Sequence, residues 1–255
     1  MDTIDPEHHV PREDKSRPGA EPASLARAVY DKLKRDILST ELPPKTKLGV
    51  EFVCDRYGFG TSPVREALTL LVGEGFVTRI EGRGFSVAGV SVEEYIELTE
   101  TRCWLEEVAL RKSMANGGAD WEDRIVLAFH HFSRLSRPAE GTRLSKNNEW
   151  VERHKAFHDA LISACGSRWL LNYCDQLREQ TYRYRRISSA ERPGGALNQH
   201  RQLMQVVLDR DPDVAVPLLM EHYRNRNETT LARFRKFEAD ESARRGRRHR
   251  RSTSP

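Results

Sequence analysis

The chain has 255 residues, of which 38% are hydrophobic and 31% charged, with a formal net charge of +4 and a mean hydropathy of -0.69. This length suits one large or two ordinary domains, and no apolar run approaches the roughly 20 residues of a membrane span, which excludes an integral membrane protein. The polar start has no secretory signal, and four separated cysteines without a CxxC pair indicate reduced thiols in the cytoplasm.

The positive charge is concentrated at the C-terminal end. Residues 242–255 hold six arginines and no acid, whereas the rest of the chain has 36 basic and 38 acidic residues. A run of like charge without apolar residues cannot bury surface, so we predict a disordered Arg-rich tail over 239–255. Because arginine runs screen phosphates, the tail is either an auxiliary DNA contact or a solubilising segment, and the sequence favours neither.

The first 90 residues contain three short helical patterns and then a hairpin. Residues 1–22 carry prolines among charges and are predicted to be a disordered leader. Hydrophobic periodicity predicts helices over 24–42, 50–57 and 62–74, with Ser24 as the N-cap of the first and Pro63 at the start of the third.

After the third helix the hydrophobic pattern changes to a period of two. The runs FVTRI and FSVAGV are joined by Glu81-Gly82-Arg83-Gly84, where the glycines supply turn geometry. Three helices followed by a hairpin are typical of a winged helix-turn-helix, a DNA-binding domain that we place over 23–90.

From Ser91 onward the sequence is helical throughout. Ser91 and Glu94 form a capping box that opens a long helix. Pro217 lies in the second turn of the last helix and predicts a kink or a restart there. The chain is therefore predicted to be mostly α, with an all-α antiparallel helical bundle over 91–238, built from helices over 95–114, 120–135, 148–165, 169–187, 197–208 and 213–237.

The start of the third helix has the chemistry of a DNA-reading element. Thr61, Ser62 and Arg65 fall in its first turns, where hydroxyls and a guanidinium can contact base edges or phosphates. Arg79 and Arg83 on the hairpin would reach the adjacent DNA backbone or minor groove. The alternative is structural, with a Ser-Pro step that only caps the helix and an arginine that pairs with a neighbouring acid. The segment TSPVREAL alone does not decide between the two.

Four motifs lie in this first domain: LPP after the first helix, SPVREAL on the third, EGFV before the hairpin and GRGFSV within it. With them, residues 24–90 resemble the winged-helix domain of GntR-type bacterial transcription regulators. Many of those regulators have arginine where this chain has Thr61, so its specificity at that position is expected to differ.

A second set of segments, TETRCWLEEVALR, HKAFHDALISACGSRWLL, QHRQLM and MEHYR, lies in the helical region. With these, residues 91–237 resemble the FadR-like branch of the same family, which has an FCD-type ligand-binding bundle. The resemblance implies a homodimer, a palindromic operator in double-stranded DNA, and an effector that is a small carboxylate or related metabolite.

Four histidines in the helical region are spaced so that they can converge. His154 and His158 are four residues apart and share a helix face. His200 and His222 each lie eleven residues from Asp211, so two helices folded back as a hairpin would place them at the same height. A lone histidine is more often a polar or packing residue, and spacing alone favours that role.

The FCD resemblance reverses this preference. It implies metal ligands at the positions of His158, His200 and His222, with His154 where the family usually has an aspartate. Four imidazoles suit a divalent transition metal such as Zn, Ni or Co, and they leave the positive charge of the ion uncompensated. An anionic carboxylate effector could complete such a site while Arg102 pairs with a second carboxylate. Arg102 could equally pair with Glu106 one turn further along its helix.

Two other function classes compete with the regulator. A metal-dependent hydrolase is disfavoured because HKAFH lacks the glutamate of HExxH, and no GxSxG, phosphate loop or dinucleotide motif is present. A nonspecific architectural DNA binder driven by the Arg-rich tail would bind any duplex with similar affinity. We predict a metabolite-responsive, sequence-specific transcription regulator, with repression as the favoured sign, and no enzymatic activity.

Overall fold

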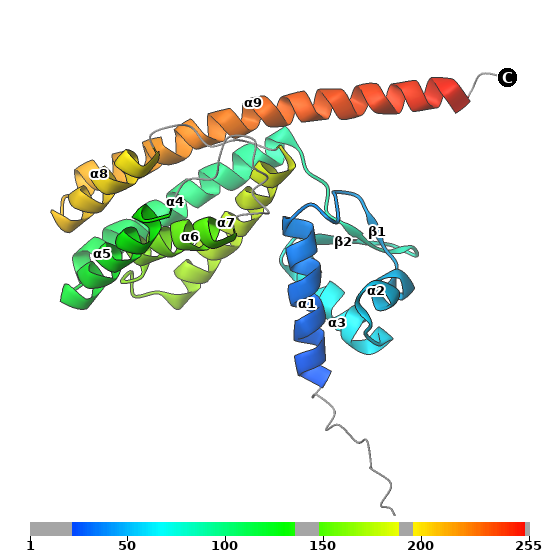
Figure 1. The fold of residues 1–255 in the computed structure, drawn as a ribbon, viewed down its shortest axis with the longest axis horizontal. Helices are drawn as coiled ribbons and strands as arrows, with labels where there is room; N and C mark the ends of the chain where they lie inside the picture. The colour runs from blue at the N-terminus through cyan, green and yellow to red at the C-terminus, as the bar shows by residue number, and fades with distance from the viewer. Residues whose placement is uncertain (1–21, 136–147, 189–195, 253–255) are drawn as a thin grey trace, which may run out of the picture.

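The computed structural model describes residues 22–135, 148–188 and 196–252. These residues form a winged helix-turn-helix domain and a separate helical bundle (Figure 1), which confirms the predicted fold class. Pro22 belongs to the first helix, and the rest of the predicted leader lies outside the described residues. No helix in the described ranges is both long and apolar enough to cross a membrane.

The winged domain is held together by three helices: α1 (Pro22–Leu38), α2 (Val50–Tyr57) and α3 (Thr61–Gly73). Their apolar stripes meet in one core, in which Val29, Leu33 and Leu68 are fully buried. The prediction of Ser24 as an N-cap is wrong, because α1 begins two residues earlier at Pro22. Proline suits the first helical position, where the missing N–H would have no intrahelical partner.

The wing is the predicted hairpin with one added strand. Strands β2 (Val77–Ile80) and β3 (Gly84–Val87) pair antiparallel, with Thr78 opposite Ser86. Gly82 and Gly84 have φ of 67° and 90°, backbone angles that favour glycine. A third strand, β1, pairs with the free edge of β3; it was not predicted because its two residues (Lys47–Leu48) are too few to show a period.

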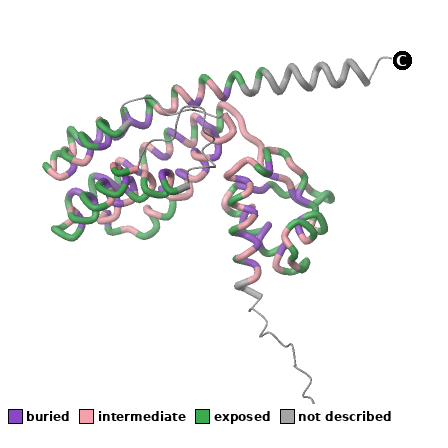
Figure 2. Tube along the Cα trace, viewed as in Figure 1, coloured by how far each residue is buried: buried purple, intermediate pink, exposed green. Residues whose placement is uncertain are grey.

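In the described part of the second body there are six helices: α4 (Val92–Asn116), α5 (Ala119–Ser133), α6 (Asn148–Ile162), α7 (Arg168–Ile187), α8 (Ala196–Leu208) and α9 (Pro212–Ser252). The buried positions lie on the faces that these helices turn toward one another, as Figure 2 shows. Trp121 and Phe157 anchor this core, and the indole of Trp121 donates a 2.9 Å hydrogen bond to the carbonyl of Ala160.

The last helix differs from its prediction in two respects. It continues through Pro217, so of the kink or restart predicted there the restart is excluded; Val216 and Leu219 pack into the core on either side of the proline. It also runs to Ser252, so the backbone of residues 239–252, predicted as disordered, is helical; the last three residues of the predicted tail lie outside the described residues. Ala and Arg favour helix, and extending an existing helix avoids the cost of nucleation.

The two bodies meet where α4 begins. Ser91 is the N-cap of α4 as predicted, because its hydroxyl accepts a 3.1 Å hydrogen bond from the amide of Glu94. The reciprocal half of the capping box is replaced: the Ser91 amide donates to the hydroxyl of Tyr184 on α7, which itself donates to the Glu94 carboxylate. Tyr184 packs with Tyr95 and Phe234 in a small apolar cluster that joins α4, α7 and α9.

Candidate metal centre and DNA-facing surface

The four predicted histidines converge in the bundle. His154 and His158 come from α6, His200 from α8 and His222 from α9. One ligand atom from each of the four lies within 4.8 Å of the others, and all except His154 are buried. The predicted return of the last two helices is therefore confirmed, because the rings of His200 and His222 are 4.6 Å apart.

Two spacings between ring nitrogens match those of neighbouring ligands on a transition-metal ion. The Nε2 atom of His200 lies 3.0 Å from that of His154 and 3.3 Å from that of His158. Two ligands each about 2.1 Å from one ion, at angles between octahedral and tetrahedral, would be about 3.0–3.4 Å apart. The Nε2 atom of His222 is buried and has no hydrogen-bond partner among the described residues, which leaves it free to coordinate. A set of imidazole nitrogen donors suits Zn, Ni or Co rather than Mg or Ca.

Aromatic rings surround these imidazoles, and two of the four are held in the uncharged form. Trp150 stacks on His154 at 4.8 Å, and Phe132 meets His200 edge-on at 5.0 Å. Burial, together with the neighbouring histidines, lowers the pKa of His158 well below its usual value. Burial also lowers the pKa of His222, helped by Arg226. Neutral imidazole is the form that binds a metal ion.

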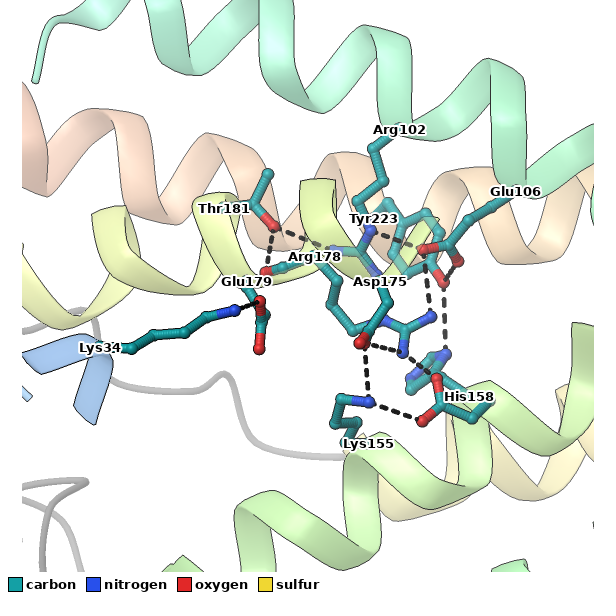
Figure 3. Close-up of polar contacts among 11 residues, drawn as sticks. Lys34, Arg102, Glu106, Lys155, His158, Asp175, Arg178, Glu179, Thr181 and Tyr223 are labelled. Carbon is teal, nitrogen blue, oxygen red and sulfur yellow. Dashed lines mark hydrogen bonds and ion pairs between the residues drawn. The ribbon is translucent and has the colours of Figure 1, made fainter. Parts of the chain in front are cut away.

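A layer of buried charge lies against the histidines. Glu106 on α4 is fully buried and accepts a 2.7 Å hydrogen bond from the Nε of Arg102 and another from the hydroxyl of Tyr223. That hydroxyl is also 3.3 Å from the Nδ1 of His158, and Nη2 of Arg178 lies 3.7 Å from the Glu106 carboxylate (Figure 3). Burial alone would raise the pKa of Glu106, but the two guanidiniums outweigh it and lower that pKa.

Arg102 pairs with Glu106, which is the structural role that the sequence offered as an alternative to effector binding. Its guanidinium pairs with Glu106 and lies 4.3 Å over the ring of Tyr223. Burial opposes its charge, yet Glu106 keeps its pKa above the ordinary value. Its positive charge still reaches the centre, because it contributes to the lowered pKa of both His158 and His222.

Sequence reasoning did not single out the arginines of α7. Arg178 approaches Glu106 and pairs with Asp159. Arg185, two turns further along, has a buried Nε without a hydrogen-bond partner among the described residues. Burial and repulsion from Arg102 lower its pKa to about 10. The seven-residue spacing of Arg178 and Arg185, which places both on one helix face, is the signal that could have revealed them.

The proposed DNA contacts are all exposed. Thr61, Ser62 and Arg65 lie in the first two turns of α3, and Arg79 and Arg83 lie on the wing. The helix begins at Thr61, one residue earlier than predicted. Its N-cap is a glycine without a side-chain cap, so the capping role considered for Ser62 is wrong. Within the described ranges Arg65 has no ion-pair partner. Donors held at the surface in this way are available to phosphates or base edges.

Family models match both bodies of the chain. The model described as "Bacterial regulatory proteins, gntR family" matches residues 25–87, and the one described as "FCD domain" matches residues 97–225. The ranges fall within the winged domain and the bundle.

Two curated relatives span most of the chain. BphR of Paraburkholderia xenovorans (strain LB400), described as an uncharacterized HTH-type transcriptional regulator, is 35% identical over 222 residues, covering 86% of this chain and 89% of its own. GlaR of Escherichia coli (strain K12), an HTH-type transcriptional repressor, is 33% identical over 199 residues, or 76% of this chain and 90% of its own.

Solved structures share the fold at lower identity. McbR/YncC of E. coli has a TM-score of 0.66 at 17% identity, and the alignment covers 82% of this chain and 98% of that one. A GntR regulator from Rhodococcus sp. RHA1 has a TM-score of 0.64 at 18% identity, with the same coverage. Because the relatives are transcriptional regulators, the hydrolase and architectural alternatives are set aside. The chain belongs to the GntR family of bacterial regulators and is a sequence-specific DNA-binding transcription regulator with an FCD domain.

Proposed function

We propose that the protein is a homodimeric repressor that leaves its operator when a small carboxylate binds in the bundle. The two winged domains of the dimer read the half-sites of a palindromic operator. In each, Thr61, Ser62 and Arg65 enter the major groove while Arg79 and Arg83 hold the adjacent backbone or minor groove. The name of GlaR, a transcriptional repressor, supports the sign of regulation.

One observation carries the effector part of this proposal. Four imidazoles, three of them buried, come together; His200 presents its Nε2 at 3.0 and 3.3 Å from those of two others, and the buried Nε2 of His222 has no hydrogen-bond partner among the described residues. We propose that His154, His158, His200 and His222 hold a Zn²⁺, Ni²⁺ or Co²⁺ ion. When bound, the ion supplies a cation that attracts an anionic oxygen ligand.

The charges around the centre favour an anion as the effector. Arg102, Arg185 and Arg226 all contribute to lowering the pKa of His222, so the positive field of three guanidiniums reaches it. The buried Nε of Arg185 lacks a hydrogen-bond partner in the described part of the chain. A carboxylate would neutralise part of this field and satisfy the donor. We therefore propose that Arg102, with Arg185, orients a small carboxylate beside the histidines.

Regulation follows from differential binding. An effector that fits one arrangement of the bundle better than another shifts the population toward that arrangement. If the favoured arrangement changes the spacing or orientation of the two winged domains, operator affinity falls by the same coupling free energy. A coupling of about 1–3 kcal/mol changes affinity roughly 5- to 150-fold.

Fluorescence anisotropy tests this function. The metal-loaded protein is titrated, at fixed salt, onto DNA from its own upstream region and onto a scrambled duplex, with and without a panel of mono- and dicarboxylates. We expect tight binding to the first duplex only, relieved by one acid, and no relief once the metal has been removed with a chelator. Equal binding to both duplexes, or operator binding that no acid changes, would refute the proposal.

A further inference from the structure

Helix α7 belongs to the bundle, and two neighbouring residues on it contact different bodies: one contacts other bundle helices and the next contacts the winged domain. On one side Arg178 pairs with Asp159 and approaches Glu106 of the bundle. One residue further, Glu179 reaches Lys34 of the winged domain at 2.6 Å. Figure 3 shows Lys34 meeting Glu179 on one side of α7 and Arg178 turned toward Glu106 on the other. A shift of either residue along this rigid helix therefore moves its neighbour.

The winged-domain end is a compact ionic contact. The Nζ of Lys34 lies 2.8 Å from the carboxylate of Glu74 and 2.6 Å from that of Glu179. Tyr30 donates a 2.6 Å hydrogen bond to Glu74, so the lysine and two carboxylates are held from α1, α3 and α7 together. Glu74 is the C-cap residue of α3, the helix that carries Arg65. The contact therefore holds the C-terminal end of α3, opposite the end that carries Arg65.

Three further hydrogen bonds from α7 reach backbone carbonyls at separate places on the winged domain. Gln180 donates to the carbonyl of Glu74 at 2.6 Å. Arg183 donates to the carbonyl of Ala88, just after β3, and Arg186 to that of Ser39, just after α1, at 3.3 Å. The ionic contact and these bonds fix the orientation of the winged domain on α7.

Three successive contacts lead from Arg178 on α7 to the histidine centre, through Glu106 and Tyr223. Arg178 approaches the buried Glu106, which accepts a hydrogen bond from the hydroxyl of Tyr223. That hydroxyl lies 3.3 Å from the Nδ1 of His158, on the side of the ring opposite the Nε2 that faces His200. A change in the position of the His158 ring would therefore move the Tyr223 hydroxyl and, through it, the Glu106 carboxylate that Arg178 approaches.

We propose that α7 transmits the occupancy of the histidine centre to the winged domain, and that Lys34, Glu74 and Glu179 form the ionic contact through which it acts. The input to this relay rests on the proposed function, because it assumes an occupant of the histidine centre. The contact itself does not depend on that assumption. Glu179 is a positioning residue in this relay and touches neither the metal nor DNA.

Hydrogen exchange of the full-length protein tests the contact. Glu179→Gln keeps the side-chain shape and leaves Lys34, Glu74 and Tyr30 paired within the winged domain. We expect amide exchange over 74–88 to rise about fivefold, as expected when a partly buried pair is broken. The matched control is Asp31→Asn, which breaks an exposed pair with Arg27 inside α1 and should change nothing there. Equal exchange in wild type and Glu179→Gln would overturn the proposal.

Adding one equivalent of NiCl₂ tests the transmission. In wild type, Ni²⁺ is expected to slow exchange both in α6 and over 74–88; in Glu179→Gln it should slow exchange in α6 only. Equal protection of 74–88 in both proteins would overturn the relay while leaving the metal centre intact. If Ni²⁺ protects neither segment of wild type, the metal centre fails and the transmission with it, while the comparison of wild type with Glu179→Gln without metal still decides whether the ionic contact stands.

Discussion

Replacing Glu106 with glutamine would expose how much the bundle depends on its buried carboxylate. The side chain is 1% exposed and lies between the guanidiniums of Arg102 and Arg178, with the Tyr223 hydroxyl on its second oxygen. Glutamine keeps the volume but leaves the buried Arg102 without its anion, removes one of the carboxylates beside Arg178, which keeps Asp159, and turns an amide donor toward another donor. Breaking one side of a buried ion pair costs about 3–5 kcal/mol, and each kcal/mol lowers Tm by about 2–4 °C in a chain of this size. We expect a fall of roughly 6–20 °C.

Tryptophan fluorescence is a suitable readout, because all four tryptophans belong to the bundle. Glu107→Gln is the matched control: the next residue on α4 has a 40% exposed side chain paired with the exposed Arg111, and solvent screens such a pair so that its loss should leave Tm nearly unchanged. The reasoning is refuted if Glu106→Gln melts within about 2 °C of wild type, or if Glu107→Gln falls as far.

The same variant makes a prediction about pH. The two guanidiniums lower the pKa of Glu106, so its carboxylate stabilises the fold above the unfolded-state pKa of about 4.3. That contribution is lost as the pH falls through the lower, folded-state pKa. The difference in stability between wild type and Glu106→Gln should therefore be full at pH 7 and shrink steadily below about pH 4. A difference that grew on acidification would contradict this assignment.

Three other predictions concern the metal, the operator and the tail. His158→Ala should lose most of its bound Zn²⁺ or Ni²⁺ in a chelator competition, whereas His131→Ala, at an exposed histidine on α5, should keep it; full metal content in His158→Ala would exclude the centre. Arg65→Ala should bind the operator about 5- to 150-fold more weakly in anisotropy, as expected from a loss of about 1–3 kcal/mol, and normal binding would rule out its DNA contact. Deleting 242–255 should preserve the preference for operator over scrambled DNA. Only the salt dependence should weaken, with the slope of log affinity against log salt concentration falling by about 0.9 for each phosphate that the tail had neutralised. Loss of the preference would assign specificity to the tail.

The local features of both bodies follow from sequence because short-range patterns determine them. A four-residue period predicts α1, a change to period two predicts the wing, and a serine before a helical run predicts the start of α4. The histidine cluster was also predictable in outline. Four-residue spacing aligns His154 with His158, and equal distances from one turn bring His200 and His222 to the same level.

Side-chain pairings and helix ends that depend on residues far away in the chain could not be predicted from the sequence. The sequence left undecided whether Arg102 would pair with Glu106 or remain available to an effector, because both roles use the same helix face. In the structure the two residues pair, Tyr223 packs against Arg102, and Arg178 approaches Glu106 from α7. The prediction of disorder at the end of α9 was wrong for a related reason. A charged run is typical of disorder when it stands alone, but here it continues a helix that is already formed.

The sequence by itself determined the two bodies, their order and the arginines proposed to contact DNA, and its resemblance to FCD domains pointed to the four histidines of the candidate metal centre. Only the tertiary structure decided how those parts are joined. Lys34, Glu74 and Glu179 come from three helices and meet in one ionic contact, and Arg178 reaches a carboxylate 72 residues earlier in the chain. Periodicity reports which face of a helix is buried, but not which charge from another helix will neutralise it, because that choice depends on the packing of all the helices at once.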